Sequence, residues 1–250
     1  MIWSILLSTL ANASTPEDIS RWVRSRPTPP GQLTEMTRYG LDDGYASSLS
    51  RWVRGQLARQ AALAVSRFQQ GQCSETSKLR VLSPGFAGLS GSNSSDFEGS
   101  VFRLETTGCL DVPDARTAEQ TYHSAAFRTA EMPNLDHVTL SDDQVCLKSG
   151  AVPGIIAATD FCLSSSRFDA DGLIVTHNAL STNHTANGAA PVYYREEIIV
   201  FAQLDDGVGV FRMIWTRGQD IGTAGRTILQ RTASSSQSRI YRSLEAWANR

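Results

Sequence analysis

The C-terminal segment of this chain constrains its fold more than any other part. Two runs with strand character, residues 192–202 and 208–216, are joined by the turn sequence Asp205-Asp206-Gly207 and followed by a terminal helix. One side of that helix is apolar at the spacing of helical turns, at Ile240, Tyr241, Leu244, Trp247 and Ala248. A helix of this kind needs an apolar surface to lie on. The sequence therefore predicts a β-hairpin with the helix packed across its sheet.

Upstream of the hairpin, strand-like runs separated by short turns predict an antiparallel meander. A helix is predicted at 115–130, beginning after Pro113-Asp114. A sheet of consecutive antiparallel strands with one face covered by helices is an α+β arrangement, which we expect over residues 99–250. The predicted strands are residues 100–112, 136–140, 144–148, 155–165 and 172–181.

Two helices are expected before this domain, in an N-terminal helical extension at residues 14–70. The first begins at Pro16 and is stopped by three prolines that precede residue 31. The second, at residues 45–70, is amphipathic, with Arg51 and Arg54 predicted on its solvent side. We interpret it as a helix packed on its own domain. Because a basic amphipathic helix can also lie on an anionic surface, peripheral membrane contact through this helix is the alternative.

Two segments are expected to lie outside the packed elements. Residues 71–98 are rich in Ser and Gly, a composition typical of a loop or connector, in which a short strand at 79–82 is the one regular element considered. Residues 1–13 are apolar and end in Ala11-Asn12-Ala13, the small-x-small pattern of a signal-peptidase site. We favour a cleaved signal peptide and, with it, a secreted or periplasmic location. The alternative is an apolar first strand or helix of a cytosolic protein.

The chain has four cysteines, Cys73, Cys109, Cys146 and Cys162, and no two of them form a C-x-x-C pair. That spacing excludes a zinc ribbon or a thioredoxin-type site. In an exported chain, an even number of cysteines predicts disulfides, and two disulfides can connect in three ways. We favour Cys146 with Cys162, on neighbouring strands, and Cys73 with Cys109, which would tie the helical extension to the first strand. The alternative is four reduced, buried thiols.

Charge and histidine spacing exclude several classes of function. The chain has 23 Lys and Arg against 25 Asp and Glu, a net charge of -2, so it lacks the excess positive charge on which nucleic-acid affinity depends. Its 4 histidines have no metal-ligand spacing. The pairs Asp142-Asp143 and Asp205-Asp206 lie in predicted turns, where Asp makes local hydrogen bonds. We expect no nucleic-acid partner, no metal, no cofactor and a monomer, and no motif predicts a catalytic residue.

The order of elements resembles the helix-grip fold of the START and Bet v 1-like (SRPBCC) superfamily. The resemblance rests on residues 101–105 leading through 111–115 into the first helix, on the paired strands 193–201 and 209–216, and on the terminal helix through Trp247. It implies a curved antiparallel sheet packed around a long C-terminal helix. It also implies a cavity between sheet and helix that holds a hydrophobic small molecule or lipid.

Strand alternation limits which residues could line such a cavity. Either Val210, Arg212 and Ile214 or Phe211, Met213 and Trp215 face inward, and the sequence leaves this open. One of Glu196 and Glu197 also faces the sheet interior, where Arg195 could pair with it. The ligand-binding residues that we expect are Glu196, Val210, Arg212, Ile214, Ile240, Leu244 and Trp247.

Three functions fit these expectations. We favour an exported, non-enzymatic protein that binds a hydrophobic or lipid-like small molecule. The second is an enzyme of the cyclase or dehydratase type, with Arg212, Glu196 or His177 reaching into the cavity. The third is an interaction module with a solid core, whose helix at 45–70 docks a partner. Two or more titratable groups in a cavity would favour the enzyme, and the absence of a cavity would favour the module.

Overall fold

The computed structural model describes residues 14–132, 135–141, 143–151, 157–185, 189–218 and 238–250. The signal peptide expected at 1–13 lies outside the described residues. The chain folds around an antiparallel sheet of eight strands. In sequence these are β1 (Thr76–Val81), β2 (Phe102–Leu110), β3 (Leu135–Leu140), β4 (Gln144–Ser149), β5 (Thr159–Ala170), β6 (Leu173–Asn183), β7 (Tyr194–Leu204) and β8 (Gly207–Arg217). Their order across the sheet is β1-β2-β8-β7-β6-β5-β4-β3, so the strand nearest the C-terminus pairs with β2.

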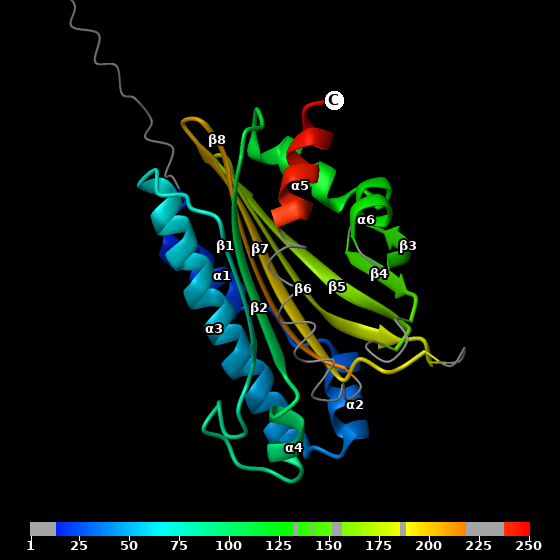
Figure 1. The fold of residues 1–250 in the computed structure, drawn as a ribbon. Helices are drawn as coiled ribbons and strands as arrows, with labels where there is room; N and C mark the ends of the chain where they lie inside the picture. The colour runs from blue at the N-terminus through cyan, green and yellow to red at the C-terminus, as the bar shows by residue number, and fades with distance from the viewer. Residues whose placement is uncertain (1–13, 133–134, 142, 152–156, 186–188, 219–237) are drawn as a thin grey trace, which may run out of the picture.

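Helices cover both faces of this sheet. One face carries α1 (Pro16–Arg24), α2 (Pro30–Tyr39) and α3 (Asp43–Gln69), and the short helix α4 (Ser94–Glu98) follows β1. The opposite face carries α5 (Ala115–His123), α6 (Ala125–Glu131) and a C-terminal helix at 238–248 (Figure 1). The predicted α+β class and helix-grip arrangement, with an N-terminal helical extension, are confirmed.

Local sequence explains where the helices begin. Thr15 Oγ1 accepts a hydrogen bond from the Asp18 amide at 3.2 Å, and the Asp18 carboxylate accepts one from the Thr15 amide at 3.0 Å, a capping box that starts α1. The sequence prediction lacks α2, because the prolines before it look like helix breakers. Pro30 instead occupies the first helical position, where no amide donor is needed.

The single helix predicted at 115–130 is divided in two. Ser124 has an extended backbone, with φ -71° and ψ 138°, and its hydroxyl accepts a hydrogen bond from the Phe127 amide at 3.1 Å. It therefore ends α5 and caps α6. This break directs α6 toward β3 rather than along the axis of α5.

The long helix α3 packs on the sheet through its apolar stripe, which includes Leu49, Val53 and Leu57. Arg51 is exposed as predicted, but the prediction for Arg54 is wrong: that side chain is buried, with 5% of its surface exposed. The sheet covers the apolar stripe, so the exposed side of α3 carries polar and charged side chains such as Arg51. Within the described ranges, no helix combines the length and the apolar character needed to span a membrane.

The hairpin register decides which residues face which helical layer. β7 and β8 pair Leu204 with Gly207, and from this pairing Ile199 lies opposite Arg212 and Glu196 opposite Trp215. Phe211, Met213 and Trp215 belong to the core under α1–α3, whereas Val210 belongs to the core under the C-terminal helix. Both sets of alternating residues in β8 are mainly apolar, because helices cover both faces of the sheet.

Two glycines let helices approach the sheet closely. A Cβ at Gly209 would lie 2.6 Å from the Phe68 ring of α3, and a Cβ at Gly108 would lie 2.6 Å from the Tyr241 ring of the C-terminal helix. The hydroxyl of Tyr241 lies 2.7 Å from Thr106 Oγ1, a buried hydrogen bond. The C-terminal helix is therefore held to β2 by both shape and polar contact.

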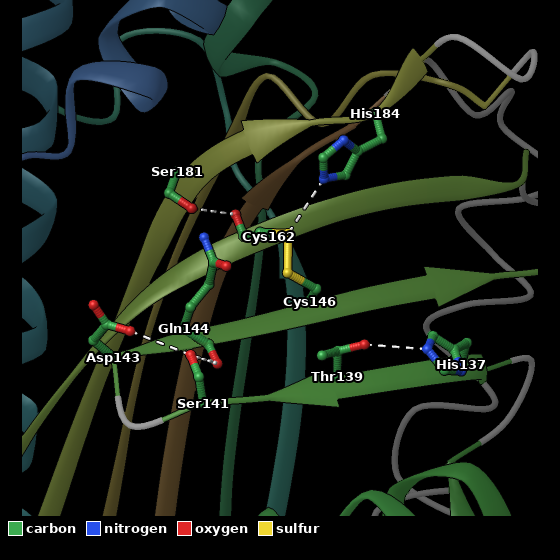
Figure 2. Close-up of a disulfide and its surroundings, with 9 residues drawn as sticks. All are labelled: His137, Thr139, Ser141, Asp143, Gln144, Cys146, Cys162, Ser181 and His184. Atoms are coloured by element: carbon green, nitrogen blue, oxygen red, sulfur yellow. Dashed lines mark hydrogen bonds between the residues drawn. A yellow bond between two sulfur atoms is a disulfide. The ribbon is translucent and has the colours of Figure 1, made fainter.

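The structure contains two disulfides, Cys73–Cys109 and Cys146–Cys162, the pairing favoured from the sequence. Cys73 follows α3 and Cys109 lies in β2, so this bond joins the helical extension to the sheet. Cys146 and Cys162 are directly opposite in β4 and β5, with His184 Nε2 3.3 Å from Cys162 Sγ (Figure 2). The pairing of β4 with β5 is thus covalently fixed.

Candidate functional site

A cavity of about 190 Å³ lies on the face of the sheet that carries α6 and the C-terminal helix. Its residues come from α6 and from strands β3 to β8, so both its floor and its side wall belong to the regular fold. One wall, on β3 to β5 and the end of α6, is mainly apolar and is formed by Met132, Leu135, Leu147, Phe161 and Leu163, with the hydroxyl residues Ser149 and Thr159 beside them. The other wall is polar and is formed by Arg128, Asn178, Arg195, Glu197 and Arg212. We call this space the arginine cavity.

Glu197 is the centre of the polar wall. Its Oε1 accepts a hydrogen bond from Arg212 Nε at 3.0 Å, and its Oε2 accepts one from an Arg195 terminal nitrogen at 3.2 Å. Burial acts to raise the pKa of this carboxyl, but Arg212 and Arg195 outweigh it and lower the pKa from 4.5 to about 2. Glu197 is therefore a fixed negative charge at neutral pH.

The arginines are held by their neighbours as well as by Glu197. Arg128 donates from Nε to the Tyr122 carbonyl at 3.0 Å and from a terminal nitrogen to His123 Nδ1 at 2.7 Å. The Tyr122 ring packs against the guanidinium carbons of both Arg128, at 5.2 Å, and Arg212, at 5.7 Å. These contacts place three guanidinium groups around one space.

His123 takes part in this arrangement as a neutral imidazole. Burial, and then the positive charge of Arg128, lowers the pKa of His123 well below its ordinary value. Since Nδ1 accepts from Arg128, the ring proton is on Nε2, which lies 3.5 Å from Thr176 Oγ1. His123 thus orients Arg128 and adds no charge.

Several polar atoms in or next to this wall have no hydrogen-bond partner in the part of the chain that the structure describes. Among the described residues, the buried Arg195 Nε has no acceptor, the buried Asn178 Oδ1 has no donor, and the buried Tyr122 hydroxyl has no hydrogen bond. Burial lowers the pKa of both Arg195 and Arg128, with Glu197 opposing the effect in each case. Buried polar groups in native proteins are normally paired. Within the described ranges, unpaired atoms also occur in packed regions, at Gln32 Oε1 and Trp215 Nε1, but at the polar wall they adjoin open space.

The structure separates the seven expected ligand-binding residues into different environments. Arg212 lines the arginine cavity. Val210, Ile240 and Leu244 are 0%, 3% and 0% exposed and belong to a packed core under the C-terminal helix. Trp247 packs against the same core and donates from Nε1 to Glu131 at 3.0 Å. Ile214 lies on the same face of β8 as Arg212, opposite Glu197 of β7, and is 6% exposed.

Glu196 lies on the opposite face of the sheet, so the expectation that it shares a site with Arg212 is wrong. Its carboxylate lies 2.9 Å from Arg54 Nε, 2.8 Å from His177 Nε2 and 2.6 Å from the Tyr194 hydroxyl, all beneath α3. Burial acts to raise its pKa, but His177 and Arg54 hold the pKa below 4.5. Of the three groups proposed for an enzyme, Arg212 alone reaches the arginine cavity.

The sequence prediction did not name Arg128, Asn178 or Glu197, which line the cavity, and it named Glu196, which lies on the opposite face of the sheet. The hairpin register could have identified Glu197: with Asp205 and Asp206 as the turn, Leu204 pairs with Gly207, and Arg212 and Glu197 then face the same side. Nothing local marks Arg128 or Asn178. In the described part of the chain, no group of three or more His, Cys, Asp or Glu side chains could hold a metal ion.

Comparison with known proteins supplies likeness at the level of fold. No protein-family model and no curated protein matches the sequence. A STAR-related lipid transfer protein fragment from Xanthomonas axonopodis is 16% identical, with a TM-score of 0.47 over 60% of this chain and 86% of its own. Human STARD10 is 9% identical, with a TM-score of 0.48 over 59% of this chain and 65% of its own, less than two thirds of its length.

A third similar solved structure carries the name of an enzyme. The Zhui aromatase/cyclase from Streptomyces sp. R1128 is 14% identical, with a TM-score of 0.41 over 60% of this chain and 94% of its own. The topology of this chain, an antiparallel sheet with the C-terminal helix packed on one face, agrees with the fold that its resemblance to the START and Bet v 1-like superfamily predicts.

Proposed function

We propose that this protein binds a small amphipathic molecule in the arginine cavity. The observation that carries the proposal is the division of the cavity into an apolar wall around Phe161 and a charged wall around Glu197. Ligand sites are typically concave and mainly apolar, with a few placed polar groups that fix orientation. The volume of about 190 Å³ suits a small molecule or one end of a longer one, rather than a whole lipid.

Two or more titratable groups in a cavity would favour the enzyme alternative, and the arginine cavity has such groups. Their chemistry, however, argues against proton transfer. Arginine remains protonated in proteins, so Arg128, Arg195 and Arg212 cannot exchange protons near neutral pH. Glu197 has a pKa of about 2, with both oxygens occupied by arginines. A general acid or base needs a pKa near the working pH. The charged wall is therefore better suited to holding a ligand than to transferring protons.

Native mass spectrometry tests the proposal. Protein purified from an exporting host is compared before and after denaturation, and we expect a bound small molecule that is lost on denaturation. Leu147→Trp should abolish it, because Leu147 lines the cavity and a larger side chain fills the space. Lys148→Trp is the matched control, since the adjacent, exposed Lys148 points to the other side of β4. Retention of the molecule by Leu147→Trp would refute the assignment.

We also propose that the protein is exported, with residues 1–13 as a cleaved signal. Support comes from the two disulfides, which persist in oxidising compartments. In an exporting host, we expect a mature chain that begins at Ser14 and has a mass short by four hydrogens for its two disulfides. An uncleaved chain with four free thiols would exclude export. Membrane contact through α3 stays a prediction that rests on the exposed basic side chains alone.

A further inference from the structure

The arginine cavity has more positive than negative charge. Arg195 and Arg212 share the single carboxylate of Glu197, and within the described ranges Arg128 forms no ion pair. The three arginines and one glutamate therefore leave two positive charges uncompensated. Arg128, Glu197 and Arg212 are 4%, 3% and 8% exposed, so bulk water does little to screen that charge.

Hydrogen-bond donors are also in excess. Glu197 already accepts at both oxygens. Among the described residues, Arg212 donates from Nε alone, and Arg195 Nε meets no acceptor. Arg128 donates to two neutral atoms, the Tyr122 carbonyl oxygen and His123 Nδ1. The wall also has one unpaired neutral acceptor, Asn178 Oδ1, so what its guanidinium groups lack is an acceptor that carries negative charge.

The buried pair on the other face of the sheet provides an internal comparison. Arg54 donates from Nε to Glu196 at 2.9 Å and from its two terminal nitrogens to the Arg26 carbonyl at 2.6 Å and Thr28 Oγ1 at 2.7 Å. Each nitrogen of that guanidinium has an acceptor. The Arg54 guanidinium is thus fully paired within the protein, whereas the Arg195 guanidinium, which lines the cavity, has an unpaired Nε.

We propose, resting on the proposed function, that the ligand carries a carboxylate or phosphate group that Arg195 and Arg212 bind, with Arg128 adding positive charge. A guanidinium donates two parallel hydrogen bonds to such a group, and unpaired buried charge is unfavourable until an anion arrives. The Arg195 guanidinium lies 5.5 Å above the Phe161 ring, so the charged and apolar walls meet there. The anion is therefore expected to be attached directly to a compact apolar body.

The cavity volume sets the size of a probe. An apolar protein cavity of about 150 Å³ binds benzene, so about 190 Å³ accommodates a six-membered ring with one carboxylate. Benzoate and benzamide have nearly the same shape and differ in charge. In calorimetric titrations of the purified protein, we expect benzoate to bind at least about tenfold more tightly than benzamide, and inorganic phosphate to bind more weakly than benzoate.

Substitutions test whether the preference for benzoate over benzamide arises in the arginine cavity. Arg195→Gln and Arg212→Gln should each lower the ratio of benzoate to benzamide affinity toward one. Arg195→Gln leaves the bond between Arg212 and Glu197 in place, so it remains informative if Arg212→Gln does not fold. Arg54→Gln is the matched control, because it removes a buried arginine from a Glu partner on the opposite face and should leave the ratio unchanged.

The outcomes separate the two proposals. Equal affinities for benzoate and benzamide, both lost in Leu147→Trp, would overturn the anionic ligand and support the amphipathic cavity. No binding of either probe would overturn both proposals. Phosphate bound as tightly as benzoate would show that the apolar wall contributes nothing and would overturn an amphipathic anion. A preference for benzoate that persists in both arginine variants would place the anion elsewhere.

Discussion

Glu196 and Glu197 are consecutive residues of β7 whose carboxylates are held by arginines on opposite faces of the sheet. Glu196 Oε1 lies 2.9 Å from Arg54 Nε of α3, and Glu197 Oε1 lies 3.0 Å from Arg212 Nε of β8. The first pair closes the interface between the N-terminal helices and the sheet. The second lines a cavity and leaves donors free. One strand therefore carries a packing contact and a candidate binding contact side by side.

The Arg54 pair predicts a large effect on stability. Arg54→Ala leaves the Glu196 carboxylate buried without its arginine, so we expect the free energy of unfolding to fall by about 3–5 kcal/mol in urea denaturation. Arg21→Ala serves as the control, because the pair of Arg21 with Asp18 is exposed and such pairs contribute about 0–1 kcal/mol. Equal effects of the two substitutions would show that the buried pair contributes little to the fold.

The depressed pKa of Glu197 predicts acid sensitivity. Its pKa is about 2 in the folded protein, below the ordinary 4.5, so the ionised carboxylate stabilises the fold above pH 4.5. That contribution is lost as the pH falls from 4.5 through 2. Urea unfolding at a series of pH values should therefore show a flatter dependence for Glu197→Gln across this range. Glu75→Gln, at an exposed position, should keep the wild-type slope, and an unchanged slope in Glu197→Gln would contradict the assignment.

The close approach of Tyr241 to Gly108 predicts that the C-terminal helix is sensitive to one methyl group. In Gly108→Ala the new Cβ would lie 2.6 Å from the ring, so the helix must shift. We expect a loss of roughly 1–3 kcal/mol in thermal unfolding, with faster proteolysis of the C-terminal helix. Gly218→Ala is the control, because a Cβ there meets no atom within 4 Å. Wild-type stability of Gly108→Ala would show that the helix is loosely held.

The disulfide between Cys73 and Cys109 predicts a dependence on redox conditions. It closes a loop with a sequence separation of 36 residues, against 16 for Cys146–Cys162. Replacing both cysteines of the longer loop by Ala should lower the free energy of unfolding by about 2–4 kcal/mol, chiefly by increasing the freedom of the unfolded chain. A reducing agent should lower the free energy of unfolding more in the wild type, which loses two disulfides, than in the double Ala variant, which loses only Cys146–Cys162. Equal losses in the two proteins would show that the Cys73–Cys109 bond contributes little to stability.

Local sequence chemistry predicted much of the fold. The capping residues at Thr15, the turn at Asp205-Asp206 and the alternation of the strands mark elements that form for reasons contained in a few adjacent residues. The same local reasoning failed at Pro30, where a residue that breaks helices from within is favourable at the first position of α2.

The candidate site was less accessible to such reasoning. Strand alternation named Arg212 together with Val210 and Ile214 as candidate cavity residues. Arg128, by contrast, looks like an ordinary helical arginine until Ser124 divides α5 from α6. The buried position of Arg54 was missed for the same reason: its acceptors, Glu196 and Thr28, are distant in sequence.

The sequence by itself determined that this chain forms an antiparallel sheet with amphipathic helices, a hairpin near its end and two pairs of cysteines within reach. Only the tertiary structure decided that Glu197 rather than Glu196 shares a face with Arg212, and that space remains under α6 while the region beneath Leu244 is filled. The reason is physical. Alternation along a strand fixes which residues share a face, but helices cover both faces of this sheet, so hydrophobicity cannot say which face adjoins which layer.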